Sequence, residues 1–353
     1  MPDQSFWKNK KVFLTGHTGF KGSWMAIWLN ELGAKVCGFA LEPNTNPTLY
    51  KLAKLDEQIT SIIGDIRDLN LLQQTMKEFA PDIVIHMAAQ PLVSESYTNP
   101  VETYSTNVMG TVNLLESVRF CETVKAVVNI TTDKVYENKE WIWGYKETDR
   151  LGGYDPYSNS KACAELVTSS YINSFFNKEN HSTAIATVRA GNVIGGGDWA
   201  VNRLIPDIMR AIENRLPLEL RNPKAVRPWQ HVLEPLSGYL LLAEKLYIDG
   251  VKWNGAWNFG PAQKDVKTVE EIVQIMLTEF QAGYEYKVDK NISFHETQQL
   301  NLDSTKATGV LKWQQKWTVE ETLKKIVEWQ KRYKSDEAVY LICKSQIAEY
   351  ESF

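Results

Sequence analysis

Tyr157 and Lys161 are residues whose types and spacing suggest chemistry. They lie four positions apart in Tyr-Ser-Asn-Ser-Lys, so a helix would place both on one face, about one turn apart. An ammonium group beside a phenol stabilises the phenolate and lowers the phenol pKa from about 10 toward neutrality. A tyrosine in that setting can act as a general base. An ordinary amphipathic helix shows the same spacing, so the pair needs support from elsewhere in the sequence.

That support comes from the segment Thr131-Thr132-Asp133-Lys134, upstream of Tyr157. It directly follows the apolar run Ala126–Ile130, which we interpret as a buried strand. Ligands of open α/β sheets bind outside the carboxyl ends of the strands, where this segment would lie. Asp133 and Lys134 would then be an acid–base pair beside Thr132. The alternative for Lys134 is an ordinary surface lysine.

A glycine-rich loop, Gly16 to Gly22 (GHTGFKG), predicts a dinucleotide site. It follows the apolar run Lys11–Thr15 and opens a helical pattern, as a phosphate-binding GxxGxxG loop requires. Free N–H groups at the helix start would bind the phosphates. The predicted cofactor-binding residues of the loop are Gly16, Thr18, Gly19, Phe20, Lys21 and Gly22. A glycine turn used only for packing is the alternative.

The residues expected at the adenosine end favour NAD over NADP. The second predicted strand ends at Ala40, and the nearest acid, Glu42, comes two residues later. No Lys or Arg between positions 36 and 48 is available for a 2′-phosphate. Asp65 and Ile66, after the third predicted strand, are candidates for contacting adenine. Asp65 as a helix cap or turn residue is equally compatible with the sequence.

Short apolar runs alternate with helical patterns along the first half of the chain. The predicted strands are 11–15, 35–40, 59–63, 82–86, 126–130, 184–188 and 256–259, and the predicted helices are 22–32, 69–79, 101–120, 157–176, 206–213 and 318–331. This alternation predicts an α/β fold, a doubly wound Rossmann-type parallel sheet with helices on both faces. Asp68 is expected to cap one helix, and Thr318 with Glu321 to form a capping box.

The pattern changes after about residue 190, which indicates a smaller, interleaved C-terminal substrate-binding lobe. We predict a Rossmann domain of residues 1–190, with a return segment at about 229–260, and a lobe of residues 191–228 and 261–353.

Composition excludes several classes of protein. The 353 residues carry 39 Lys and Arg against 43 Asp and Glu, too acidic a balance for electrostatic binding of nucleic acid. No apolar run approaches the ~18 residues of a membrane span. The absence of an apolar leader and the four scattered cysteines favour a cytoplasmic protein with free thiols. The five histidines and four cysteines show no metal-ligand spacing, so we expect no metal.

Together these motifs resemble the extended short-chain dehydrogenase/reductase family. The resemblance rests on GxxGxxG, the segment HMAAQ at 86–90, Thr132 at a strand end, YxxxK, and LDSTKATGVLKW at 302–313. It implies bound NAD and an oxidation triad. Thr132 would bond a sugar 4-hydroxyl, Tyr157 would take its proton, and Lys161 would bond the nicotinamide ribose and lower the tyrosine pKa.

Four segments (HTGFKGSW, TTDKVYEN, GNVIGGGDW and VRPWQHVLEP) are similar to those of family members that dehydrate CDP-glucose. This resemblance implies a nucleotide-sugar 4,6-dehydratase with CDP-glucose as substrate. Most such enzymes have Asp-Glu where this chain has Asp133-Lys134. Asp133 is therefore the expected acid, and Lys134 is either the C5 base or an electrostatic stabiliser. Another nucleotide-sugar dehydratase or 4-epimerase, or a catalytically silent NAD-binding protein, remain the alternatives.

The resemblance implies further site residues and an oligomer. The implied cofactor ligands are Ala88, Ala89, Gln90, Asn107, Thr131, Tyr157 and Lys161, and the implied substrate ligands are Gln90, Thr132, Asn192, Trp199, Arg203, Leu204 and Arg227. A homodimer or homotetramer is expected, with helices 101–120 and 157–176 pairing with their copies through apolar residues such as Val112, Leu115 and Val167.

Overall fold

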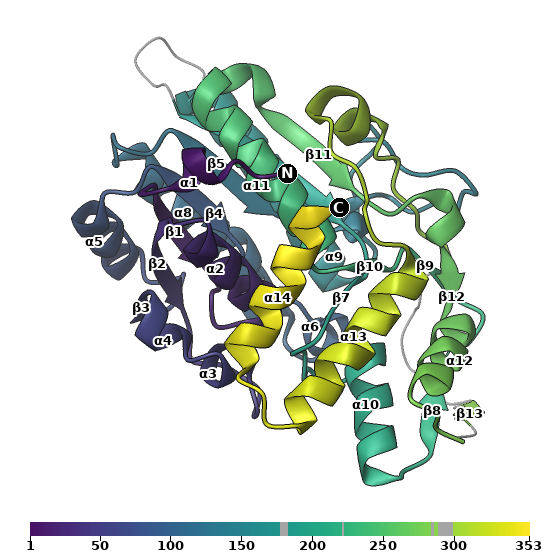
Figure 1. Cartoon of the computed structure of the whole chain (residues 1–353). Helices are drawn as coiled ribbons and strands as arrows, with labels where there is room; N and C mark the ends of the chain where they lie inside the picture. The colour runs from purple at the N-terminus through teal and green to yellow at the C-terminus, as the bar shows by residue number, and fades with distance from the viewer. Residues whose placement is uncertain (177–182, 221, 284–285, 289–298) are drawn as a thin grey trace.

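A parallel sheet of seven strands forms the centre of the computed structural model (Figure 1). The structure describes residues 1–176, 183–220, 222–283, 286–288 and 299–353. The strands are β1 (Lys11–Thr15), β2 (Lys35–Ala40), β3 (Thr60–Ile63), β4 (Ile83–His86), β5 (Ala126–Ile130), β6 (Ala184–Ala190) and β11 (Gly255–Phe259). Each begins within one residue of its predicted position.

The strand order is β11-β6-β5-β4-β1-β2-β3, and every neighbouring pair is parallel. The chain starts in the middle, at β1, and winds outward in both directions. The order therefore reverses between β1 and β4, where ligands of such sheets bind. The predicted Rossmann-type fold is confirmed.

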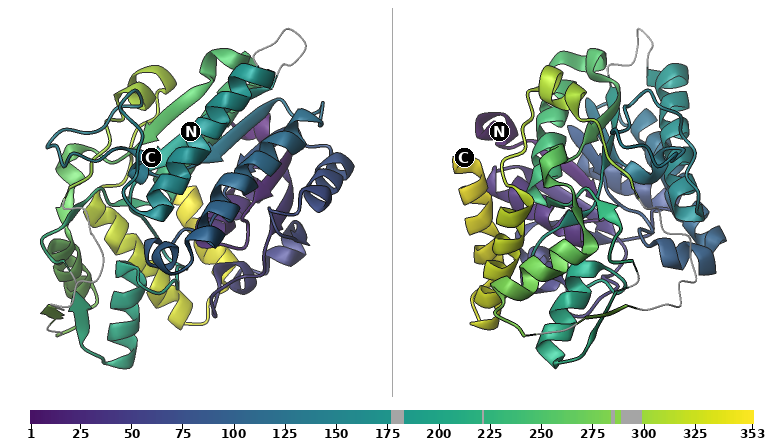
Figure 2. Two further views of the ribbon diagram at one scale, coloured as in Figure 1. Left: turned by 180° about the vertical axis from the view of Figure 1, so that it is seen from behind. Right: turned by 90° about the vertical axis from the view of Figure 1, so that its right-hand side faces the viewer.

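Helices cover both faces of this sheet (Figure 2). One face carries α2 (Phe20–Glu31), α11 (Leu233–Asp249) and α14 (Val339–Ser352), and the other carries α5 (Leu69–Phe79), α8 (Gly110–Arg119) and α9 (Pro156–Tyr171). Helix α5 begins where predicted, because the side chain of Asp68 accepts the Leu71 N–H as an N-cap.

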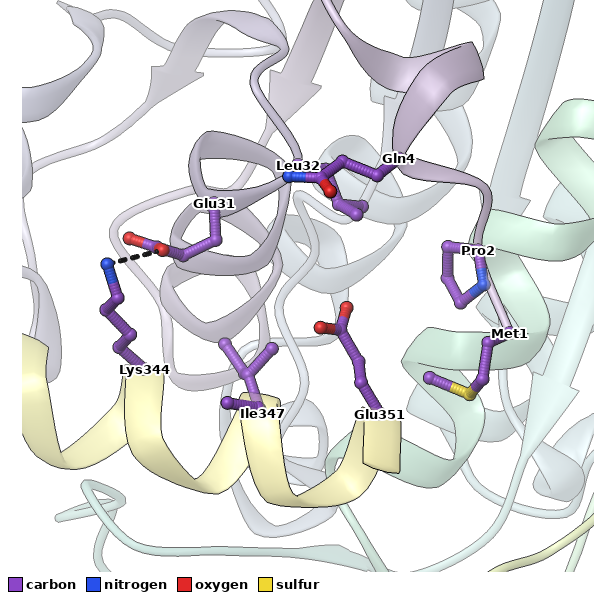
Figure 3. Close-up of a pocket in the computed structure, with 9 residues that line it drawn as sticks. Met1, Pro2, Gln4, Glu31, Leu32, Lys344, Ile347 and Glu351 are labelled. Atoms are coloured by element: carbon purple, nitrogen blue, oxygen red, sulfur yellow. Dashed lines mark ion pairs between the residues drawn. The ribbon is translucent and has the colours of Figure 1, made fainter. Parts of the chain in front are cut away.

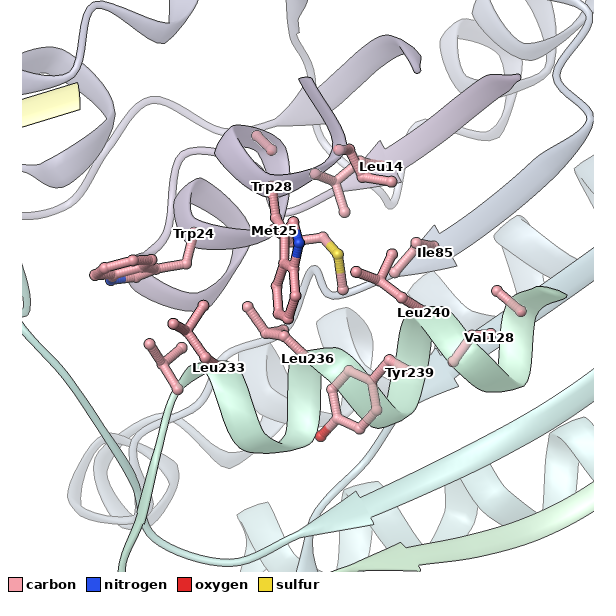
Figure 4. Close-up of a cluster of buried hydrophobic side chains, with 14 of the residues drawn as sticks. Leu14, Trp24, Met25, Trp28, Ile85, Val128, Leu233, Leu236, Tyr239 and Leu240 are labelled. Carbon is pink, nitrogen blue, oxygen red and sulfur yellow. The ribbon is translucent and has the colours of Figure 1, made fainter. Parts of the chain in front are cut away.

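The larger core cluster lies between the sheet and helices α2 and α11. Figure 4 shows Trp24 and Trp28 of α2 beside Leu236 and Tyr239 of α11, with side chains of three strands facing them. All four of these residues are fully buried. Helix α2, buried on most of its surface, therefore holds the glycine loop that precedes it in a fixed position.

The remaining elements complete the C-terminal part and the loops. The helices are α1 (Gln4–Trp7), α3 (Leu49–Leu52), α4 (Leu55–Gln58), α6 (Val93–Thr98), α7 (Pro100–Tyr104), α10 (Leu204–Asn214), α12 (Val269–Glu279) and α13 (Val319–Lys334). The short strand pairs are β7 (Val193–Ile194) with β10 (Gln230–His231), β8 (Leu218–Leu220) with β13 (Tyr286–Val288), and β9 (Val226–Arg227) with β12 (Lys267–Thr268).

Helices α10, α12 and α13 pack around a hydrophobic cluster of their own. The capping box of Thr318 and Glu321 opens α13, as predicted. Helix α14 instead packs on α2 and contributes to the core beside the sheet, although the sequence assigns it to the C-terminal lobe.

The predicted helix 101–120 is divided into three parts. Helix α7 is followed by a π-helical turn, Ser105–Met109, and only then by α8. A second π-helical turn, Ile172–Phe176, follows α9. The outward apolar face also differs from expectation, because Leu115 is buried and Val167 packs against the core. The exposed large apolar residues of α7, α9 and the turn Ser105–Met109 are Val101, Met109 and Leu166.

None of the described helices is both long and apolar enough to cross a membrane. A cavity of about 320 Å³ lies between α14, the end of α2 and the first residues of the chain (Figure 3). Lys344 and Glu31 form an ion pair of 2.8 Å across it. No predicted catalytic or binding residue lines this cavity.

Candidate active site

The glycine loop has the close backbone packing that its sequence predicts. Gly16 has φ +76°, and a Cβ on Gly22 would lie 2.0 Å from the Gly16 carbonyl oxygen. Gly19 is the N-cap of α2 and offers no side-chain bond to the first N–H groups of the helix. Those N–H groups can bind an anion. The Thr18 hydroxyl donates to the Leu41 carbonyl oxygen (2.9 Å), which ties the loop to the end of β2.

Asp65 follows β3, and its carboxylate is held by Arg67. The Arg67 guanidinium forms an ion pair with Asp65 (2.5 Å) and another with Glu102 (2.6 Å). Hydrogen bonding from Arg67 lowers the pKa of Asp65. Ile66, beside it, packs so closely on Gly110 that a Cβ there would lie 2.7 Å from its Cγ2. Both residues stay predicted adenine contacts.

Tyr157 and Lys161 lie on the buried face of α9, a helix capped by the side chain of Asp155. The Lys161 ammonium donates to the Ile130 carbonyl oxygen at 2.9 Å. Burial lowers the pKa of Lys161 to about 7, Lys21 lowers it further, and Glu165 opposes the change.

Burial raises the pKa of Tyr157 to about 12. Its hydrogen bond with Thr132 and the charge of Arg203 lower the pKa, but by less than burial raises it. The Lys161 ammonium is directed to the end of β5. The role of Lys161 in lowering the tyrosine pKa stays a prediction.

Thr132, Asp133 and Lys134 form the turn that follows β5. The Thr132 hydroxyl donates to Asp133 Oδ1 at 3.0 Å, and a single 3₁₀ turn begins at Asp133. Asp133 is buried, and burial raises its pKa, although Lys134, Thr132 and Arg227 act against the shift. A Cβ on Gly191 would lie 3.1 Å from Asp133 Oδ2, so the carboxyl group packs against the chain after β6. A carboxyl whose pKa is raised in this way suits a proton donor.

Basic side chains from three separate elements lie near Asp133, Tyr157 and Lys161. Lys21 extends from the first turn of α2, and burial with the charge of Arg203 lowers its pKa to about 8, while Asp133 opposes the change. Arg203 precedes α10 and pairs with Asp198 at 3.1 Å. Arg227 lies on β9 and interacts with Asp133. The sequence placed Lys21 in the phosphate loop only, and its charge interactions with Asp133 and Lys161 come from the structure.

The side chain of Asn107 forms hydrogen bonds with the backbone of Gln90. Asn107, in the first π-helical turn, accepts the Gln90 N–H and donates to the Gln90 carbonyl and to Ser160. The Gln90 side chain bonds Leu92 and Thr103. These bonds hold the loop after β4 in place, and the ligand contacts of Gln90 and Asn107 stay predictions. Ala88, in this loop, donates its N–H to the Thr15 hydroxyl, and Ala89 follows it.

Thr131, the first residue after β5, is bonded inside the protein. Its hydroxyl donates to Glu165 Oε1 at 2.6 Å and its N–H to the Val188 carbonyl, both inside the protein. Thr131 therefore holds Glu165, and its contact with the cofactor stays a prediction. Glu165 was missed by sequence reasoning, although its position four residues after Lys161 on the same helix is a signal that could have found it.

The remaining predicted substrate residues line the start of the C-terminal part. Trp199 packs edge-on against Trp329 and Tyr333, with ring centroids 5.9 and 5.8 Å apart, and its contact with the substrate stays a prediction. Asn192 accepts the Gln230 N–H with its carbonyl, and Leu204 begins α10. Among the described residues, no group of three or more His, Cys, Asp or Glu side chains is arranged to hold a metal ion.

Comparison with known families decides which group of enzymes this site belongs to. The family model described as GDP-mannose 4,6 dehydratase matches residues 13–326. The chain belongs to this family. A curated relative, the CDP-glucose 4,6-dehydratase of Salmonella typhimurium, is 54% identical over 355 residues, covering 100% of this chain and 99% of the relative. The Mycoplasma genitalium UDP-glucose 4-epimerase is 26% identical over 66% of this chain and 71% of its own.

Solved structures with the same fold are more distant in sequence. The Thermotoga maritima UDP-glucose 4-epimerase, solved with UDP-glucose, has a TM-score of 0.80 and 20% identity, covering 92% of this chain and 99% of its own. The Brucella ovis UDP-glucose 4-epimerase, solved with NAD, has a TM-score of 0.77 and 23% identity, covering 90% of this chain and 97% of its own. These two structures show that the chain shares its fold with them.

Proposed function

We propose that this chain is an NAD-dependent CDP-glucose 4,6-dehydratase, converting CDP-D-glucose to CDP-4-keto-6-deoxy-D-glucose and water. The identity of 54% over the full length of the Salmonella enzyme supports the choice of substrate. The observation that carries the reaction type is the turn after β5. Asp133, buried and with a raised pKa, lies beside Thr132, whose hydroxyl bonds both Asp133 and Tyr157.

The phosphate loop fits NAD. Its glycines allow close backbone approach, and the uncapped start of α2 suits a pyrophosphate. Between positions 36 and 48 no Lys or Arg is present for a 2′-phosphate, which favours NAD over NADP. Lys161 and the loop from Gly16 to Gly22 would hold the cofactor. When bound, NAD supplies a hydride acceptor for sugar C4 and the hydride that is returned to C6.

In the oxidation, Tyr157 takes the proton of the sugar 4-hydroxyl while Thr132 bonds the same oxygen. Because burial raises the pKa of Tyr157 to about 12, phenolate formation requires nearby positive charge. Arg203 contributes such charge, and Lys161 would contribute more if its ammonium turned from Ile130 toward the phenol.

The elimination follows because C5–H becomes acidic only beside a 4-ketone. Asp133 donates a proton to the C6 hydroxyl, which then leaves as water. Lys134 is only partly buried beside Asp133, where its amine could accept the C5 proton or stabilise the enolate oxygen. A 4-epimerase needs neither group, since its chemistry is confined to C4.

The test is incubation of the purified protein with CDP-glucose, without added cofactor or reductant. The expected result is the alkaline absorbance of a 4-keto product, no net release of NADH, and transfer of deuterium from C4 to C6 within one molecule. Parallel assays with dTDP-, UDP- and GDP-glucose identify a dehydratase for another nucleotide. Formation of the C4 epimer would contradict the proposal, and so would stoichiometric release of NADH.

We also propose a homodimer or homotetramer in which α7, α9 and the π-helical turn between α7 and α8 face a second copy. Val101, Met109 and Leu166 are 82%, 51% and 59% exposed on these helices. Exposed large apolar side chains on neighbouring helices are common at interfaces between subunits. The division into a Rossmann domain and a substrate lobe, and a cytoplasmic location, also stay proposals.

A further inference from the structure

Glu165 and Arg189 form an ion pair deep inside the protein. Glu165 lies on α9, four residues after Lys161, and Arg189 lies on β6. Their side chains are 4% and 3% exposed, and Arg189 Nε lies 2.9 Å from Glu165 Oε1. The Arg189 Nη2 atom donates to the other carboxylate oxygen at 3.0 Å, so the pairing is bidentate.

The two ends of the catalytic turn are bonded to this ion pair. Before the turn, the Thr131 hydroxyl donates to Glu165 Oε1 at 2.6 Å. After it, Arg189 Nη1 donates to the Tyr136 hydroxyl at 2.7 Å, and the guanidinium stacks over the Tyr136 ring at 4.8 Å. The segment from Thr132 to Val135 therefore runs between two anchors. Thr131 is bonded to Glu165, and Tyr136 is bonded to Arg189.

The Tyr136 anchor continues into the C-terminal part of the fold. The Tyr136 hydroxyl donates to Asn258 Oδ1 at 2.7 Å, on β11. Asn258 Nδ2 then donates to the carbonyls of Tyr145 (2.8 Å) and Asp303 (3.1 Å). The hydroxyls of Thr131 and Tyr136 and the charged groups of Glu165 and Arg189 therefore all have hydrogen-bond partners.

Stability alone is a weak reason for such a pair, because well-packed apolar residues of similar volume are often as stable. The pair also fixes the position of the turn after β5 relative to helix α9. Helix α9 carries Tyr157 and Lys161, the groups of the oxidation, and the turn carries Asp133 and Lys134, the groups of the elimination.

We propose that Glu165 and Arg189, acting through Thr131 and Tyr136, are positioning residues that set the elimination groups relative to the oxidation groups. The inference rests on the proposed function. Loosening the Tyr136 anchor should displace Asp133 and Lys134. Thr132 adjoins the Thr131 anchor, which the change leaves intact, so Thr132, Tyr157 and Lys161 should keep their places. A displacement of about 1 Å is enough to slow a step up to 100-fold.

The test compares the two steps in single turnovers with CDP-glucose. Glu165→Gln would leave Arg189 unpaired and risks misfolding, so the main variant is Tyr136→Phe, which removes one hydroxyl. We expect C4 oxidation, seen as enzyme-bound NADH, within about threefold of wild type, and product formation at least about tenfold slower. Bound NADH should therefore accumulate.

Tyr145→Phe is the matched control. Tyr145 stacks on Tyr136 with ring centroids 5.1 Å apart, and its hydroxyl bonds Asn138 and the Lys139 N–H, away from Arg189. Equal slowing of both steps in Tyr136→Phe, rates equal to wild type, or the same accumulation of NADH in Tyr145→Phe would overturn the inference. A wild-type protein that makes the epimer instead would overturn the proposed function, and one that oxidises no nucleotide sugar would overturn both.

Discussion

The Nζ atom of Lys161 lies 2.9 Å from the carbonyl oxygen of Ile130, the last residue of β5. This hydrogen bond connects the helix that carries Tyr157 to the strand that leads into Thr132. The ammonium is buried, and burial lowers its pKa to about 7. Lys161 is thus held at the end of the strand that leads into Thr132 and Asp133.

Tyr157→Phe tests the oxidation. We expect an intact fold and cofactor binding, because only one hydroxyl is removed, and a turnover lower by about 10²–10⁴, the usual contribution of a general base. Turnover is followed as formation of the 4-keto product. Tyr154→Phe, an exposed tyrosine three residues earlier, is the control and should keep normal rates. Turnover of Tyr157→Phe within a few-fold of wild type would remove Tyr157 from the mechanism.

Lys134→Met tests the elimination. The variant keeps the length and apolar stem of the side chain but loses the charge and the proton site. Oxidation depends on Thr132, Tyr157 and Lys161, so we expect bound NADH and 4-keto-glucose nucleotide to accumulate, with slow solvent exchange at C5. Stopped-flow absorbance of the reduced nicotinamide measures this.

The control for Lys134→Met is Lys139→Met, which removes a lysine paired with Glu137 on the following loop. It should leave rates near normal, as most surface substitutions do. Normal rates in Lys134→Met as well would make Lys134 a bystander. Loss of the oxidation itself would place it in substrate binding.

Glu234→Gln tests a pH dependence of stability. Glu234, buried on α11, accepts the Trp317 N–H at 2.8 Å and the Tyr350 hydroxyl at 2.7 Å, and burial raises its pKa from 4.5 to about 7. Between these values the folded state keeps a proton that the unfolded state releases. Stability from this group is therefore complete below about pH 4.5 and is lost as the pH rises through 7, by roughly 3 kcal/mol.

The expected result is a smaller loss of unfolding free energy from pH 5 to pH 8 in Glu234→Gln than in wild type, measured by urea denaturation. Glu328→Gln, with a carboxylate 43% exposed on α13, is the control and should follow wild type. The same pH slope in Glu234→Gln and wild type would show that Glu234 does not titrate in this range.

Leu166→Glu tests the oligomer. Leu166 is 59% exposed on α9, and a charge there should oppose pairing with a second copy. Sedimentation velocity should find smaller species than for wild type. Val310→Glu, at a residue 58% exposed after β11, is the control and should not change the assembly. A monomeric wild type would contradict the proposed interface.

The strands and the glycine loop were predictable because their signals are local. Runs such as Ala126–Ile130 are apolar and bounded by turn residues, and Gly16 and Gly22 are required by contacts within the loop itself. The π-helical turn at Asn107 was not predictable, since it inserts one residue into a continuous helical pattern and follows from bonds with Gln90 and Ser160.

The direction of polar side chains was the other limit. Thr131 and Gln90 were predicted to bind ligands, and the sequence did not indicate that Thr131 bonds Glu165 or that Gln90 bonds Thr103. These partners are distant in the sequence, and hydrophobic periodicity carries no information about them. For the same reason, the sequence showed that Leu115 lies on an apolar face of its helix. It did not show whether that face packs in the core or at an interface between subunits.

The last helix has a consequence for how the chain is made. Trp28 of α2 donates its indole N–H to Glu351 at 2.8 Å, from a position 323 residues away, and its ring meets Tyr350 edge-on. During synthesis, α2 is therefore finished long before α14 exists to cover it. The part of the indole that meets Tyr350 and Glu351 stays uncovered in a nascent chain until α14 leaves the ribosome, and chaperones can bind it in that interval.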